Sequence, residues 1–331
     1  MNLYTTVEMP QLPDLSYKTQ LLMMGSCFAT EMGTKLSEAK FKVDVNPYGV
    51  LYNPCSIATA LREMLHGKQY AAEDLFFHQN CWHSTMHHGD FSSISKEEAL
   101  QHINYRLELA HRELKVLDVL MITWGTAWVY EEKQSGRLVG NCHKLPAKHF
   151  QRRKLDVEEI VDEYTSLLTE IFAETPELKV VLTVSPIRHL RDGLHENQLS
   201  KATLLLAVNR LQEIFQGRLF YFPAYEILLD ELRDYRFYAD DLLHPSAKAI
   251  EIIWQRLVAK CMSIETQILM KRLQELKQAL NHRPLHPENE DYKRFLEQIV
   301  LNIEEIQKKY PYIELENEKE LCRTRLNRLQ R

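Results

Sequence analysis

The chain has 331 residues, of which 45% are hydrophobic and 26% are charged, and these shares argue against a disordered or fibrous protein. The formal net charge is −5 and Lys and Arg form no basic stripe, so we do not expect nucleic acid as a partner. No run of 18 apolar residues predicts a transmembrane helix. The first residues do not show the basic segment followed by an apolar segment that is typical of a signal peptide. We therefore expect a cytoplasmic protein without membrane contact.

Five short apolar segments that end at turn residues are predicted as strands: residues 21–25, 41–46, 117–125, 179–186 and 218–223. Helical spacing predicts helices over residues 28–36, 56–65, 96–114, 157–172, 200–215 and 245–262. Alternating strands and helices predict an α/β fold, a three-layer sandwich with a central parallel sheet. In such sheets ligands bind at the carboxyl ends of the strands.

Two insertions interrupt this alternation. They are residues 67–95, rich in His and aromatic residues, and a predicted hairpin over residues 128–141, and both could wall a substrate pocket. From residue 263 onward the composition changes to long charged helices, predicted over 266–281 and 288–309. We therefore divide the chain into an α/β domain, residues 1–262, and a helical C-terminal extension, residues 263–331. Its apolar positions suit packing on the main domain or on a second subunit in a homodimer.

The first predicted strand stops at Gly25-Ser26, and an amphipathic helix begins directly after it. This places Ser26 at a helix N-terminus, where backbone N–H groups stabilise an oxyanion, so the hydroxyl is well placed to attack a carbonyl carbon. The alternative role for Ser26 is an N-cap. Cys27 is a rival nucleophile, although a small cysteine in the core is the commoner case.

Asp241 and His244 lie three residues apart after the last predicted strand. At this spacing the carboxylate can accept from imidazole Nδ1–H and leave Nε2 free to take the proton of a serine hydroxyl. The alternative is a surface aspartate beside a capping histidine. Taken together with Ser26, the pair predicts a serine nucleophile with its general base.

The run GSCFA at residues 25–29 resembles the signature of the GSCFA family, which is related to the SGNH/GDSL hydrolase superfamily. Residues 46–49, 52–54, 124–127, 185–189, 191–193 and 221–244 also look like the family, so the resemblance covers about residues 21–262. It implies a flavodoxin-like fold of the SGNH-hydrolase type and ester hydrolysis through an acyl-serine. The implied nucleophile is Ser26, with Asp241 and His244 as the paired acid and base.

The same resemblance implies an oxyanion hole built from the N–H groups of Ser26 and Gly49. The superfamily's third block usually adds an Asn after a Gly, whereas here Gly125 is followed by Thr126. Thr126 could donate through its hydroxyl or its N–H, and Asn141 could fold back to donate instead. Losing one such donor typically costs about a hundredfold to a thousandfold in rate, so we expect slow catalysis or an unusual substrate.

Four residues are tentative substrate contacts: Arg188, His143, Asn141 and His88. Arg188 follows the fourth strand and could hold a carboxylate or phosphate with two N–H groups, or it could form an internal salt bridge to Asp192, Glu226 or Asp234. His143, with its neighbour Lys144, follows the hairpin and could reach the pocket, and a structural role is equally open. His87 or His88 could line the pocket mouth.

The cluster Cys81, His83, His87 and His88 raises the question of a metal, but its Gly, Ser and Thr neighbours favour a loop, so we expect none. Phosphate-loop and dinucleotide motifs are missing, and no cofactor is expected. The sequence therefore predicts an esterase acting on a small-molecule or carbohydrate ester, such as acetate on a sugar. The alternatives are an acyltransferase with the same residues and a non-catalytic binding or scaffold protein.

Overall fold

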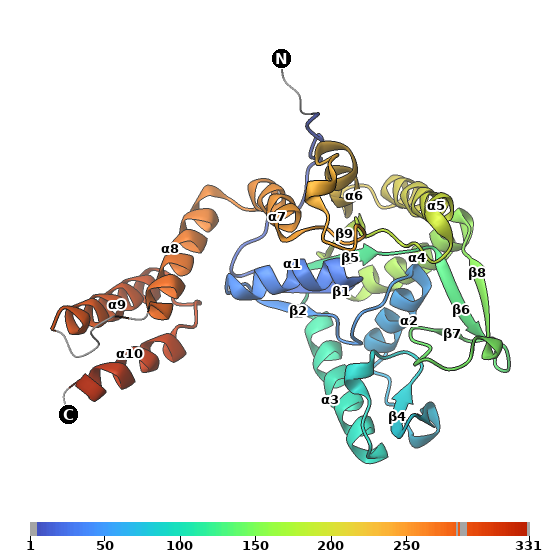
Figure 1. Ribbon diagram of the computed structural model, residues 1–331, viewed down its shortest axis with the longest axis horizontal. Coiled ribbons are helices and arrows are strands. Elements are labelled where there is room, and N and C mark those ends of the chain that lie inside the picture. Colours follow the sequence, from blue (N-terminus) through green and yellow to red (C-terminus); the bar gives the residue numbers. More distant parts are fainter. Residues whose placement is uncertain (1–4, 283, 285–289, 330–331) are drawn as a thin grey trace. The chain divides into compact units, whose positions relative to one another are not determined.

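The computed structural model describes residues 5–282, 284 and 290–329 (Figure 1). Contacts within the chain divide it into two compact units. The first holds the described part of residues 1–14 together with residues 19–35 and 43–261. The second holds residues 15–18 and 36–42 together with the described part of residues 262–331. Two short early segments therefore share a unit with C-terminal residues, a grouping that the sequence did not suggest.

A five-stranded parallel sheet forms the centre of the first unit, in the order β10-β9-β5-β1-β2. Its strands are β1 (Leu21–Gly25), β2 (Val43–Val45), β5 (Val119–Trp124), β9 (Lys179–Val184) and β10 (Leu219–Tyr221). All five lie within the predicted segments, and the α/β fold with a central parallel sheet is confirmed. The chain passes from β1 to β2 on one side and then to β5 on the other. Strand order therefore reverses between β1 and β5, which is where sheets of this kind bind ligands.

Helices cover both faces of the sheet because successive side chains of each strand point to opposite faces and both sets are buried. Leu22, Met24 and Ile122 belong to one buried cluster with residues of α2 (Pro54–Leu65), α3 (Lys96–Leu114), α4 (Val157–Glu174) and α5 (Gly193–Ile214). Helix α1 (Cys27–Glu38) crosses in front of the sheet in Figure 1, and its buried Phe28 and Met32 lie outside that cluster. Helices α6 (Ala224–Glu226) and α7 (Ala247–Cys261) follow β10.

The two insertions contain small antiparallel sheets. Residues 67–95 hold the pair β3 (Leu75–His78) and β4 (Cys81–Ser84), which was not predicted. The predicted hairpin is present as β6 (Trp128–Glu132) and β7 (Leu138–Val139), and β8 (Phe150–Lys154) joins β6 on its other side. Short helical turns lie at Ala72–Asp74, Gly89–Phe91, Ala147–His149, Ile227–Glu231 and Tyr235–Phe237.

The second unit contains α8 (Ile264–Asn281), α9 (Glu290–Lys309) and α10 (Glu316–Leu329). The first two agree with predicted helices, although the predicted beginning of α9 at residue 288 lies outside the described residues. Helical spacing in α8 predicts packing by five apolar residues, of which Leu269, Leu273, Leu276 and Leu280 are buried and Ile268 is exposed. No helix within the described part of the chain has the length and apolar content needed to cross a bilayer. Homodimer formation stays a prediction.

Candidate active site

A pocket of about 770 Å³ lies at the carboxyl ends of the central strands, where the strand order reverses. Ser26 and Cys27 come from the end of β1, Thr126 from the end of β5, and Ser185 from the end of β9. Strands β6, β7 and β8 and the loop over residues 187–192 add further lining residues, and His244 completes it. The predicted hairpin thus contributes to the pocket, as the sequence suggested.

The turn between β1 and α1 holds Ser26 in place. Gly25 has a φ of 132°, and a Cβ there would lie 2.1 Å from the Thr123 carbonyl oxygen, so only glycine fits. The Gly25 N–H donates to Asn46 Oδ1 over 2.8 Å, which fixes the end of β1. Ser26 is 1% exposed, and its Oγ has no hydrogen-bond partner in the part of the chain that is described. The hydroxyl therefore does not cap α1.

The pair Asp241 and His244 is held by a closed turn. Asp241 Oδ1 accepts from the N–H groups of Leu243 and His244 over 2.9 and 3.0 Å, and Oδ2 lies 2.5 Å from His244 Nδ1. Leu242 takes a positive φ of 59° to close this turn. The backbone N–H groups of His244 and Leu243, together with the imidazole, lower the pKa of Asp241 to about 2. The carboxylate is therefore ionised and orients the imidazole with Nε2 free.

Ser26 and His244 line the same pocket without a direct bond, because Ser26 Oγ has no partner among the described residues. The His244 and Asp241 side chains are 51% and 46% exposed, whereas the serine is buried. In unliganded enzymes such catalytic bonds are often long and shorten only when substrate binds. The Leu243 carbonyl accepts from the Arg188 N–H over 3.2 Å, which ties the Asp–His turn to the loop after β9.

The expected oxyanion donors are engaged within the protein. The Ser26 N–H donates to Thr123 O over 3.2 Å, and the Thr126 N–H donates to Tyr52 O over 3.0 Å. The Gly49 N–H donates to Asn46 O over 2.7 Å, and Gly49 does not line the pocket. Its place in the sequence suggested otherwise, but this N–H is used within the turn after β2. The Thr126 hydroxyl contacts Ser200 Oγ at 3.1 Å, and at the start of α1 the N–H groups of Ala29 and Thr30 donate to Ser26 O. The N–H groups of Cys27 and Phe28, in the first turn of α1, are therefore the better candidate donors.

Of the tentative substrate contacts, Asn141, Arg188 and His88 line the pocket. His143 does not, because its Nε2 lies 2.8 Å from Ser84 O and its ring packs on His83 at 4.4 Å. Burial lowers the pKa of His143. His143 is therefore not part of the candidate site.

Arg188 does not form the internal salt bridge that the sequence left open. The three candidate carboxylates contact other groups: Asp192 pairs with Arg152, Glu226 accepts from the Tyr221 hydroxyl, and Asp234 pairs with Arg236. The Arg188 guanidinium instead lies over the Tyr238 ring, 4.0 Å from its centroid.

Of the four residues in the cluster Cys81, His83, His87 and His88, only His87 is buried in the core. Within residues 5–282, 284 and 290–329, no three His, Cys, Asp or Glu side chains are arranged to hold a metal ion. His87 is fully buried, lies 2.9 Å from Ser84 Oγ through Nδ1 and stacks on Tyr48. Burial lowers the pKa of His87 to about 3, so the ring is neutral. Of the two histidines considered for the pocket mouth, only His88 lines it.

Comparison with known proteins identifies the family. The model described as the GSCFA family matches residues 20–257, which include Ser26, Asp241 and His244. The chain belongs to the GSCFA family. A second model, described as the C-terminal domain of GSCFA domain proteins, matches residues 273–328.

No curated protein matches this GSCFA chain. Among solved structures, it is similar to a crystal structure of a carbohydrate esterase family 3 from Talaromyces cellulolyticus. The two share 10% sequence identity with a TM-score of 0.36, over 76% of this chain and 99% of that chain.

Sequence reasoning missed a buried lysine beside this GSCFA pocket. Lys201 in α5 is 1% exposed, and its Nζ donates to Gly125 O over 2.7 Å and to Ser185 O over 2.6 Å. Burial lowers the pKa of Lys201 to about 7. The signal was present, because Lys201 shares helical spacing with the apolar positions Leu204 and Val208. A lone lysine on an apolar helix face predicts a buried amine that needs hydrogen-bond partners.

The neighbouring His189 lines the pocket, and its Nε2 is buried without a partner among the described residues. Burial, together with the charge of Lys201, lowers the pKa of His189 to about 4. The ring is therefore neutral near pH 7. His189 therefore contributes a neutral imidazole, with the unpartnered Nε2, to the lining of the pocket.

Proposed function

We propose that this protein hydrolyses an ester through an acyl-serine intermediate on Ser26. The observation that carries the proposal is a buried hydroxyl without a partner, at the start of α1, in the same pocket as an imidazole held by a carboxylate. A buried hydroxyl without a hydrogen bond costs stability, so its presence favours a functional reason for keeping it. Ser26 would be the nucleophile, His244 the general base and Asp241 the group that orients the base.

In the proposed reaction, His244 Nε2 takes the proton of the Ser26 hydroxyl as Oγ attacks the carbonyl carbon of the ester. The resulting oxyanion is stabilised by the N–H groups and the positive dipole end of α1. Collapse of the tetrahedral intermediate breaks the bond to the alcohol, which leaves with the proton from His244. Water, deprotonated by the same imidazole, then releases the acid from Ser26.

The substrate we propose is an O-acyl group on a small or carbohydrate-like alcohol, met in the cytoplasm. An acyltransferase would use the same residues and differ in the acceptor that replaces water. The scaffold alternative is less well supported, because a scaffold has no need for an unpartnered serine in the same pocket as an oriented imidazole. Fold alone does not decide between these functions.

The proposal is tested by treating the folded protein with a fluorophosphonate probe and locating the adduct by mass spectrometry. We expect one adduct on Ser26, because an ordinary serine does not react with such probes. The adduct should be lost in Ser26→Ala and His244→Ala. Its persistence in Cys27→Ala would assign the reaction to the serine and not to the adjacent thiol. Folded wild-type protein that takes up no probe would contradict the proposal.

A further inference from the structure

We infer that the ester cleaved at this site carries an anionic group, a carboxylate or a phosphate, bound by Arg188 and Arg191. The inference rests on the proposed function, since it names the substrate class of the same pocket. It starts from the charges of the lining residues. Four of them are cationic, Lys144, Arg152, Arg188 and Arg191, and one is an acid, Asp192.

The single acidic residue is already neutralised. Asp192 and Arg152 form a bidentate pair, in which Nη2 lies 2.5 Å from Oδ2 and Nη1 contacts Oδ1. Throughout the described ranges, no ion pair joins Lys144, Arg188 or Arg191 to a carboxylate. Three positive charges therefore face the pocket without a negative partner. A substrate that brings a negative charge would balance them, and a neutral ester would not.

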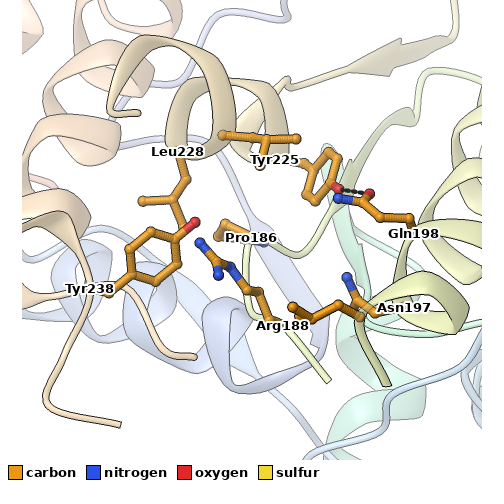
Figure 2. Close-up of a pocket in the computed structure, with 9 residues that line it drawn as sticks. Pro186, Arg188, Asn197, Gln198, Tyr225, Leu228 and Tyr238 are labelled. Atoms are coloured by element: carbon orange, nitrogen blue, oxygen red, sulfur yellow. Dashed lines mark hydrogen bonds between the residues drawn. The ribbon is translucent and has the colours of Figure 1, made fainter. Parts of the chain in front are cut away.

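Both arginines are held by tyrosine rings. The Arg188 guanidinium lies 4.0 Å from the ring centroid of Tyr238 and 5.5 Å from that of Tyr235. Figure 2 shows the Arg188 side chain extended beside Tyr238. Arg191 donates from Nη1 to the Tyr130 hydroxyl, and its guanidinium lies 5.4 Å from the centroid of that ring.

Aromatic contacts of this kind orient a guanidinium without cancelling its charge. The remaining N–H groups stay available for a bidentate bond to a carboxylate or a phosphate. These arginines are therefore ordered before a ligand arrives, which lowers the entropy lost on binding.

Arg188 also lines a second, smaller pocket of about 210 Å³, whose wall includes Pro186, Leu194 and Leu228 (Figure 2). A change at Arg188 would alter both pockets, whereas Arg191 lines only the larger of the two. Arg191→Gln is therefore the sharper variant. It keeps a polar side chain of similar length and removes the charge. Arg112→Gln makes the same change on the exposed surface of α3, away from the pocket, and is the matched control.

The kinetic test compares esters of matched shape and different charge. On the alcohol side, p-acetoxybenzoate and p-acetoxyphenyl phosphate are compared with neutral p-acetoxybenzamide. On the acyl side, the mono-p-nitrophenyl ester of succinic acid is compared with its methyl ester, and release of p-nitrophenol is followed. We expect wild-type kcat/KM to be at least about tenfold higher for an anionic ester than for its neutral match, through a lower KM.

Arg191→Gln should lower that preference by about tenfold, toward equal kcat/KM for the charged and neutral esters, and Arg112→Gln should keep the preference. A preference among the acetates would place the charge on the alcohol side of the ester, and a preference among the succinates would place it on the acyl side. Comparing p-acetoxybenzoate with p-acetoxyphenyl phosphate tells whether the site prefers a carboxylate or a phosphate. Equal rates for every charged and neutral pair, or a preference that Arg191→Gln leaves intact, would overturn the inference while the esterase reaction itself stands.

A binding measurement separates this inference from the proposed reaction. In Ser26→Ala, which cannot form an acyl-enzyme, inorganic phosphate and benzoate are titrated by calorimetry. We expect binding that is at least about tenfold weaker when Arg191→Gln is added and unchanged when Arg112→Gln is added. If wild-type protein hydrolyses no ester but Ser26→Ala binds these anions in a manner that depends on Arg191, the anion site stands and the hydrolase is refuted. Absence of binding, or binding equal in both double variants, would refute the anion site.

Discussion

Replacing His244 by alanine is expected to lower kcat/KM for p-nitrophenyl acetate by about three to four orders of magnitude. The expectation follows from the geometry of the Asp–His turn. Asp241 is fixed by two backbone N–H groups and holds Nδ1 of His244, so Nε2 is the free basic atom. No other residue that lines the pocket combines these features. The measurement is steady-state kinetics on wild type and variant over the same range of substrate.

His88 provides the matched comparison. It also lines the pocket and also has a carboxylate near Nδ1, since Asp90 lies 3.0 Å away. The Asp90 side chain, however, is 82% exposed, so this pair lacks the rigid support of the Asp–His turn. We expect His88→Ala to lose less than about tenfold, far less than His244→Ala. Equal losses in the two variants would contradict the assignment of His244 as the base.

Residues that act as one catalytic unit show non-additive losses. The double variant Ser26→Ala, His244→Ala should therefore be no slower than Ser26→Ala alone. Two losses that multiply would mean that the serine and the histidine act in separate steps. The same experiment then argues against a triad even if each single variant is slow.

The central sheet could be predicted because its strands are buried on both faces and are therefore almost uniformly apolar. Helix α3 was predicted with the bounds that the structure gives it. Ser95 caps its first turn, with the side-chain Oγ accepting from the Glu98 N–H. The N-cap residue and the helical spacing both stand in the local sequence. Helices and strands could therefore be predicted from the sequence where the local residue pattern agrees with the burial that the fold imposes.

Two elements with little buried apolar surface, β8 and α10, could not be predicted. Strand β8 contains Gln151, Arg152, Arg153 and Lys154, and it forms because β6 supplies hydrogen bonds and acidic partners such as Glu131. Helix α10 has a single buried residue, Cys322, and little apolar periodicity. In both cases the stabilising partner comes from another part of the chain. The local sequence pattern cannot predict a partner that lies elsewhere in the chain.

The candidate site was predicted in part for the same reason. Ser26, Asp241 and His244 each stand in a recognisable local pattern, and the structure brings Ser26 and His244 into one pocket. The oxyanion donors depend on where each N–H points. Gly49 and Thr126 stand at the expected positions, but their N–H groups donate to Asn46 O and Tyr52 O. Of the two, only Thr126 lines the pocket, and position along a strand could not predict the direction of either N–H group.

Lys201 leads to a prediction about stability and pH. Its side chain is buried, and burial lowers its pKa from 10.5 to about 7. The folded pKa lies below the unfolded value, so between about pH 7 and pH 10.5 the unfolded state holds a proton that the folded state has released. The free energy of unfolding therefore rises with pH in this window, by at most about 1.4 kcal/mol per pH unit from this group.

The variant Lys201→Met removes this dependence. We expect its free energy of unfolding, relative to wild type, to fall by about 3 kcal/mol between pH 7 and pH 10. Urea unfolding, followed by circular dichroism at several pH values, measures this difference in the free energy of unfolding. The control is Lys248→Met, an exposed change on α7, whose free energy of unfolding should change with pH as that of wild type does. If the free energy of unfolding of Lys201→Met also changes with pH as that of wild type does, the Lys201 amine stays charged in the folded wild-type protein. Its hydrogen bonds to Gly125 O and Ser185 O would then hold an ammonium beside the site, adding a further positive charge near His189.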